Sequence, residues 1–118
     1  MDKISGLLNA SPEKRYKHFI STAADTEKVW MLCNDDGFAS VDDEYINLLV
    51  FPEQCFAEMF ADQDVPTEID VYDFCERCAE IREDEKIRFA VFPNGKNATI
   101  VSAEDLLNDL KEELSLYE

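Results

Sequence analysis

The first long helix is predicted where apolar side chains recur at helical spacing directly after a capping sequence. Ser11 offers a hydroxyl to the free N–H groups of a helix start, and Pro12 suits the first helical position. An apolar face then extends to about Asp25 and contains Tyr16, Phe19, Ile20 and Ala23. We therefore expect a helix over residues 12–25, preceded by a short N-terminal segment, residues 1–10, that can be flexible.

Three short apolar runs separated by acidic turns come next. The first run, residues 29–33, ends at the turn Asn34-Asp35-Asp36-Gly37, whose Asp-Gly pair favours a hairpin. Residues 38–41 are expected to return as a second strand. Residues 46–51 then form a third, well-buried strand after the turn Asp42-Asp43-Glu44. This pattern predicts a three-stranded meander.

Two helices are predicted in the middle of the chain. Pro52 opens the first, because the apolar residues after it fall on one side of a helix: Cys55, Phe56, Met59 and Phe60. A short extended piece at residues 67–69 leads to Asp70. The carboxylate of Asp70 can cap a second helix, whose apolar stripe reaches about Glu83.

A hairpin and a last helix complete the pattern. Residues 86–92 alternate as a strand, Asn94-Gly95 suits a two-residue turn, and residues 98–101 return. Ser102 then caps a helix that extends to Tyr117. The order αβββααββα predicts a single α+β domain over residues 11–118. We expect a mostly antiparallel sheet, formed by the meander and the C-terminal hairpin, packed against about four helices.

Acidic residues strongly outnumber basic ones. The 118 residues include 27 Asp and Glu against 11 Lys and Arg, a net charge of −16, and no basic residue lies between Lys28 and Arg77. Such a field repels nucleic acid and anionic membranes, which bind proteins mainly through Lys and Arg, and it attracts a basic protein surface. No stretch has the pattern of a signal peptide or a membrane span. We therefore expect a cytoplasmic protein with a basic protein as its partner, and no binding to nucleic acid or membrane.

Cys75 and Cys78 are two residue types that can carry chemistry, since thiolates at this spacing bind zinc or exchange disulfides. Both lie on the apolar stripe of the helix after Asp70, and the chain offers no second pair of ligands. Core packing is therefore expected, with metal binding and redox chemistry as the alternatives. His18 is the only histidine and is expected at the surface of the first helix.

Motifs of the common catalytic and metal sites are missing. The acidic turn before Phe38 fails the calcium-loop register, because Leu32 would occupy the first ligand position. The sequence also contains no glycine-rich nucleotide motif, nucleophile elbow or zinc-protease motif. We therefore expect no enzymatic activity, no metal and no cofactor.

Several segments together resemble one protein family. They are residues 16–19, Val29-Trp30-Met31-Leu32, Asp35-Asp36-Gly37-Phe38-Ala39, Leu49-Val50-Phe51-Pro52 with Phe56-Ala57-Glu58, Phe89-Ala90-Val91-Phe92-Pro93 and the acidic end 112–118. Over nearly the whole chain they are similar to the bacterial family catalogued as domain of unknown function 2750. The resemblance implies a compact bacterial α+β domain and supplies no catalytic residue. The strand–proline–helix segment is also similar to that of SseB-like proteins, small acidic domains linked to secretion or toxin–immunity settings.

Three functions remain open at this point. The first is a non-enzymatic adaptor, inhibitor or immunity-type protein whose acidic turns bind a basic partner surface; the acids are Asp35, Asp36, Asp42, Asp43 and Glu44. The alternative is a small-ligand-binding or enzymatic domain with a pocket lined by Trp30, Phe38 and Tyr45. The third is a structural subunit that forms a homo-oligomer through a sheet edge or the last helix.

Overall fold

The structure, a computed structural model, describes residues 3–35 and 37–117, with side chains from Gly6 onward. Its helices are α1 (Lys3–Leu8), α2 (Pro12–Thr26), α3 (Gln54–Glu58), α4 (Val71–Ile81) and α5 (Ala103–Ser115). Its strands are β1 (Lys28–Asn34), β2 (Gly37–Phe38), β3 (Ser40–Asp42), β4 (Ile46–Val50), β5 (Val65–Asp70), β6 (Ile87–Val91) and β7 (Thr99–Ser102). The chain is therefore an α+β protein, as the sequence predicts.

The strands form two sheets. One has the order β2-β1-β5, and the other has the order β3-β4-β6-β7. The pairing is antiparallel except between β4 and β6, which run parallel. A mostly antiparallel arrangement is thus confirmed. The extended piece expected at residues 67–69 lies in β5, which pairs with β1 along its whole length.

The predicted meander is divided between the two sheets at Ala39. Phe38 pairs with Cys33 in the first sheet, whereas Ser40 pairs with Leu48 in the second. Ala39 serves both: its N–H donates to the carbonyl of Leu32 (2.7 Å), and its carbonyl accepts from the N–H of Leu49 (3.2 Å). The second strand expected over residues 38–41 is therefore two short strands, because the chain changes sheets in its middle.

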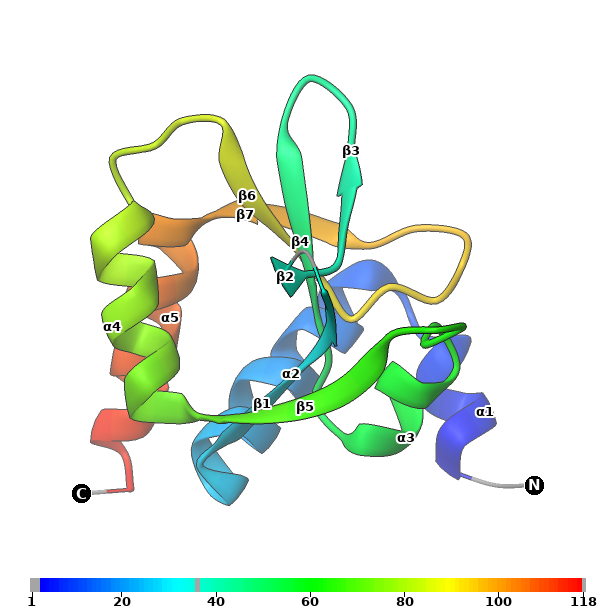
Figure 1. Ribbon diagram of the computed structural model, residues 1–118. Helices are drawn as coiled ribbons and strands as arrows, with labels where there is room; N and C mark the ends of the chain where they lie inside the picture. Colours follow the sequence, from blue (N-terminus) through cyan, green and yellow to red (C-terminus); the bar gives the residue numbers. More distant parts are fainter. Residues whose placement is uncertain (1–2, 36, 118) are drawn as a thin grey trace.

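Helices pack against the strands of both sheets and enclose the core. In Figure 1, α4 and α5 lie side by side along one flank, and α2 passes behind β1 and β5. Aromatic pairs fill the interior, with ring centroids 5.3 Å apart for Phe74 and Phe89 and 4.6 Å apart for Phe56 and Phe92. These four rings are at most 2% exposed, so their burial supplies a large part of the hydrophobic stabilisation.

The predicted helix caps are present. The Oγ of Ser11 accepts from the N–H of Lys14 (3.2 Å), Asp70 accepts from the N–H of Tyr72 (2.9 Å), and Ser102 accepts from the N–H of Asp105 (3.1 Å). The N-terminal segment adds an element that the sequence pattern does not predict. Residues 3–8 form α1, and its side chains Leu7 and Leu8 are half-buried against the core.

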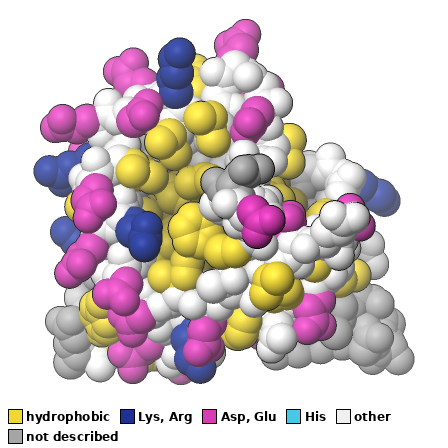
Figure 2. All heavy atoms as spheres, in the orientation of Figure 1, with side chains coloured by type: hydrophobic (Ala, Val, Ile, Leu, Met, Phe, Trp, Pro, Cys, Tyr) yellow, Lys and Arg dark blue, Asp and Glu magenta, His cyan; other side chains and the backbone are white. Residues whose placement is uncertain are grey.

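Charge and apolar surface are separated on the face shown in Figure 2. Apolar side chains gather at its centre, between α4 and β2, and acidic side chains together with several basic ones surround them. Phe38 on β2 is one of the partly buried hydrophobic residues that pack against the core.

Candidate functional site

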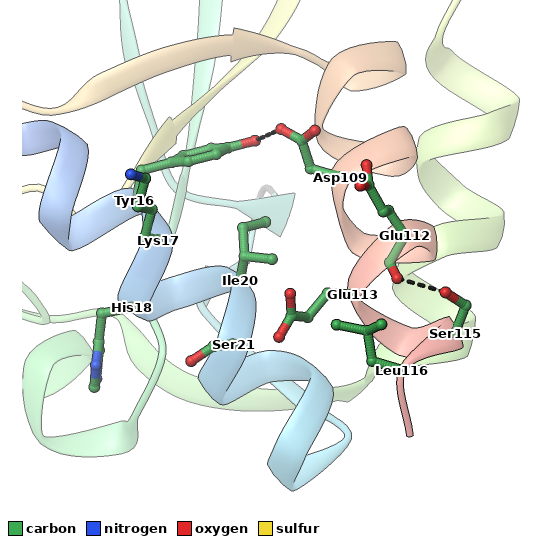
Figure 3. Close-up of a pocket in the computed structure, with 10 residues that line it drawn as sticks. All are labelled: Tyr16, Lys17, His18, Ile20, Ser21, Asp109, Glu112, Glu113, Ser115 and Leu116. Carbon is green, nitrogen blue, oxygen red and sulfur yellow. Dashed lines mark hydrogen bonds between the residues drawn. The ribbon is translucent and has the colours of Figure 1, made fainter. Parts of the chain in front are cut away.

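The largest hollow described on the molecule lies between α2 and α5 and has a volume of about 680 Å³ (Figure 3). Its lining from α2 comprises Tyr16, Lys17, His18, Ile20 and Ser21. Its lining from α5 and the residue that follows comprises Asp109, Glu112, Glu113, Ser115 and Leu116. In Figure 3 the side chains of Ile20, Glu113 and Leu116 point into the space between the two helices.

A hydrogen bond between Tyr16 and Asp109 joins the two walls. The phenol O–H of Tyr16 donates to Oδ2 of Asp109, as the dashed line in Figure 3 shows. Burial raises the pKa of Tyr16 well above its usual range, and the neighbouring carboxylate of Asp109 raises it further. The phenol therefore stays protonated, so its role here is to hold the helices together and not to exchange protons.

The α5 wall of the hollow is acidic. Asp109, Glu112 and Glu113 fall at spacings of three and four residues and so share one side of the helix. The α2 wall contributes one lysine, Lys17, whose ammonium lies 3.6 Å from the carboxylate of Glu13, with both side chains at least 75% exposed. Three carboxylates therefore face one ammonium, which is itself paired with another acid, so the hollow has a negative potential.

Helix ends strengthen this potential. α2 and α5 run toward the same end of the molecule (Figure 1), and neither has a basic residue in its last turn. A helix C-terminus carries a partial negative charge, which Lys or Arg ordinarily compensates. Here the last turn of α5 carries Glu112 and Glu113 instead. Two apolar side chains follow immediately, Leu116 at 74% exposed and Tyr117 at 53%.

The acids predicted to bind a partner belong to two separate turns. Asp42 ends β3, Asp43 and Glu44 follow it in the turn before β4, Asp35 follows β1, and Asp36 lies outside the described residues. Figure 1 shows the β3–β4 turn standing well away from the end of β1. Two of these carboxylates have local roles. Asp42 accepts from the hydroxyl of Ser40 (2.6 Å), and Asp43 accepts from the N–H of Tyr45 (2.7 Å).

The three aromatic residues of the alternative pocket do not line one common hollow. Phe38 lines a hollow beside α4, where the guanidinium of Arg77 lies 5.8 Å from its ring centroid. Tyr45 lines another hollow and has the guanidinium of Arg88 over its ring at 4.2 Å. Trp30 is half-buried and lines none of the five described hollows, and its backbone exchanges hydrogen bonds with Phe51 (3.0 and 2.8 Å).

The histidine and the paired cysteines are held in packing roles. His18 is half-buried, not fully at the surface. Its ring centroid lies 6.0 Å from that of Phe92, its Nε2 is hydrogen-bonded to Thr22 (3.3 Å), and Figure 3 shows it pointing away from the space between the helices. Cys75 and Cys78 are buried in the core as predicted, and burial raises the pKa of Cys78 to about 12. In the described part of the chain no cluster of three metal-ligating side chains is found.

Sequence reasoning did not single out Asp109, Glu112 and Glu113. One signal was available, namely a last turn of the final predicted helix that holds acids and no basic residue. The facing wall was not predictable from that signal, because the contact between Tyr16 and Asp109 joins positions far apart in the chain.

Comparison with known proteins gives one match. A protein-family model described as a protein of unknown function (DUF2750) matches residues 16–110, which span the elements from α2 into α5. No curated protein and no solved structure matches. Among the described residues, none of the helices combines the length and the apolar character that crossing a bilayer requires.

Proposed function

The chain belongs to the DUF2750 family, and we propose that it is a non-enzymatic interaction domain that binds a basic segment of another protein in the hollow between α2 and α5. This family has no assigned function, so the proposal rests on the hollow itself. We place the binding in the bacterial cytoplasm, following the expectations drawn from the sequence.

The observation that carries the proposal is the uncompensated negative charge at one end of the hollow. Glu112 and Glu113 stand in the last turn of α5, where the helix dipole is already negative. This arrangement costs the protein some folding stability, and a bound Lys or Arg side chain would recover it. A basic partner therefore gains from both carboxylates and from the helix end.

The same hollow also contains exposed apolar surface that a bound partner can bury. Leu116 points between the helices and is 74% exposed, whereas Ile20 at the floor of the hollow is only 7% exposed. Charge alone attracts many basic molecules weakly, whereas burial of an apolar anchor between charged contacts gives specificity. The partner segment expected here therefore has an apolar side chain flanked by Lys or Arg.

The acidic turns are a less favourable place for this contact. Asp42 and Asp43 are engaged in hydrogen bonds within their own turn, and the turn after β1 lies apart from it. The turn acids contribute to the overall field that draws a basic protein toward the domain. The hollow supplies the shape that the turns lack.

A non-enzymatic role is supported by the placement of the reactive side chains. The His18 ring packs on that of Phe92 and its Nε2 is hydrogen-bonded to Thr22, while the thiols of Cys75 and Cys78 lie in the core with raised pKa values. Tyr16 is held protonated by its surroundings. The hollow therefore presents carboxylates and apolar groups to a ligand, and no activated nucleophile.

Two variants with equal charge changes test the location. We would measure, by fluorescence anisotropy, the affinity of a synthetic amphipathic helix of Leu and Lys for the wild type, for Glu112→Gln/Glu113→Gln and for Asp35→Asn/Glu44→Gln. Glu112→Gln/Glu113→Gln, which changes the hollow, should bind the peptide about three- to tenfold more weakly than the wild type. Asp35→Asn/Glu44→Gln, which changes the turns, should bind it like the wild type. Equal losses in both variants would reduce the effect to overall charge and overturn the proposed site. Capture of the tagged wild type and both variants from its own cell lysate, at low and moderate salt, would then identify the natural partner.

A further inference from the structure

A second hollow, of about 340 Å³, lies on the outer face of the sheet β3-β4-β6-β7. The strand register places three side chains on this face: Leu49 pairs with Ala90, and Ala90 pairs with Ile100. Val41 and Asn47 extend the same face, since they are paired across β3 and β4. The alternate positions of these strands, among them Val50, Phe89 and Val91, are buried in the core. This second hollow is thus separate from the hollow between α2 and α5.

The lining is mostly apolar and is completed by neighbouring loops. The walls are completed by Phe60, which follows α3, and by five residues of the loop before β7: Pro93, Gly95, Lys96, Asn97 and Ala98. One acid, Asp43, and one basic residue, Lys96, are also part of the lining. In a chain with a net charge of −16 this hollow carries no excess of acid, so its local charge favours a neutral ligand.

Asn47 brings an unsatisfied polar group to this hollow. The residue is only 5% exposed. Its Nδ2 donates to the carbonyl of Val41 (2.9 Å) and to Oδ1 of Asp43 (3.3 Å), and both partners are acceptors. The orientation of the amide is therefore fixed, which leaves Oδ1 as a buried acceptor with no partner in the structure. Buried polar groups of this kind are rare in folded proteins because each one costs stability.

A second buried unsatisfied group belongs to the neighbouring strand β6. Arg88 is the register partner of Asn47 across the parallel pair β4 and β6, and its Nε is also buried without a hydrogen-bond partner. In the described part of the chain these are the two buried side-chain nitrogen or oxygen atoms that lack a partner. Arg88 lines a different hollow, with its guanidinium over the ring of Tyr45, so Asn47 Oδ1 is the unsatisfied atom that belongs to the hollow on the outer face.

We propose that the hollow on the outer face binds a small, neutral, largely apolar molecule that donates a hydrogen bond to Oδ1 of Asn47. The volume lies at the lower end of the range for small-molecule sites, which combine apolar walls with a few placed polar groups. The oxygen is covered in the structure, but Val41 and Ile100 in the lining are 60% and 48% exposed. Binding requires lining side chains such as these to move aside.

Indole and 1-methylindole form a matched pair of probes, because they share an apolar body and differ in the N–H donor. Each would be titrated into ¹⁵N-labelled protein and followed by two-dimensional NMR. Indole should shift the side-chain amide of Asn47 and the backbone amides of Leu49, Ala90 and Ala98. The methylated probe should bind at least about fivefold more weakly, which is the loss expected when a buried acceptor goes unpaired.

Two variants locate the effect. In Asn47→Leu the two probes should bind with equal affinity, because the acceptor is gone while the shape is kept. Ala98→Phe, at a partly buried loop position that lines the hollow, should fill it and abolish binding of both. Three results would overturn the proposal: indole shifts that map elsewhere or are absent, equal binding of both probes by the wild type, or a preference for indole that survives in Asn47→Leu. If Asn47→Leu does not fold, binding of the probes to Ala98→Phe tests whether they occupy this hollow. The affinities of the two probes for the wild type then test whether the site recognises the N–H donor.

Discussion

The Nε of Arg15 donates a hydrogen bond of 3.0 Å to the carbonyl oxygen of Phe92, a residue whose backbone lies in the left-handed region at φ 50°. The other guanidinium nitrogens of Arg15 donate to the carbonyls of Ala10 (2.6 Å) and Asn97 (2.9 Å). Arg15 is 1% exposed, and these acceptors are neutral carbonyl groups. A single buried cation therefore connects the start of α2, the end of β6 and the loop before β7.

Arg15→Met should lower the free energy of unfolding by about 3 kcal/mol, because three backbone carbonyls lose their donor inside the protein. Urea unfolding followed by circular dichroism measures this loss. Lys14→Met is the matched control: the neighbouring side chain on α2 is exposed, and its removal should change stability by about 0.5 kcal/mol or less. Similar losses in the two variants would contradict a structural role for the Arg15 guanidinium.

Local signals account for what the sequence predicted well. The capping residues Ser11, Asp70 and Ser102 act within three residues, so their roles can be read from neighbouring letters. The division of the second strand at Ala39 could not be predicted, because it depends on which sheet each half joins. Arg15 stands one helical turn before Phe19, on the buried side of α2, but a charged residue in that position reads as solvent-exposed.

The candidate site shows the same limit. Composition indicated a strongly acidic chain and led to a predicted partner site in the turns, where Asp43 accepts a hydrogen bond from the N–H of Tyr45. The hollow between α2 and α5 forms only when these two helices pack together, so the sequence pattern does not predict it. The hydrogen bond between Tyr16 and Asp109 depends on tertiary packing and not on local sequence.

Glu112→Gln should raise the free energy of unfolding by about 0.3–1 kcal/mol, because it removes a negative charge from the C-terminal turn of α5. Glu104→Gln, in the first turn of the same helix, should have the opposite sign, since an acid there is favourable. Thermal unfolding of both variants at low salt measures the difference. If the free energy of unfolding changed with the same sign in both variants, the helix dipole would not set the potential in the hollow between α2 and α5.

Glu27→Gly should stabilise the protein by about 0.5–1 kcal/mol. Glu27 is the C-cap of α2 and adopts φ 60°, a conformation that glycine reaches without the strain caused by a Cβ atom. Glu27→Gln removes the charge but keeps the Cβ atom, so it separates the two contributions. Chemical denaturation of the three proteins provides the comparison, and a Gly variant no more stable than the Gln variant would contradict the backbone explanation.

Stability should fall as the pH rises from about 9 toward 12. The thiol of Cys78 ionises near pH 9.0 in the unfolded chain, but burial raises its pKa to about 12 in the fold. The unfolded state therefore releases a proton first, and stability that is complete below pH 9 is lost through this window, by at most about 4 kcal/mol. Tyr16, whose pKa is also raised, acts in the same direction.

Cys78→Ala should make the alkaline slope shallower while lowering stability at neutral pH through lost packing. Urea midpoints measured between pH 7 and 11 give both quantities. An unchanged slope in the variant would mean that the Cys78 thiol does not contribute to the alkaline loss.

The parallel pairing of β4 with β6 has a consequence for synthesis on the ribosome. β4 is made early, but the neighbour that covers one of its edges follows only after α3, β5 and α4 have been made. Until then the apolar strand has only the short β3 beside it, and its open edge can pair with other chains. The β1–β2 and β6–β7 hairpins can form as soon as they emerge, whereas joining β4 to β6 requires closure of the long intervening loop. Folding of the nascent chain is therefore completed late, and a ribosome that stalls before β6 would leave an aggregation-prone product.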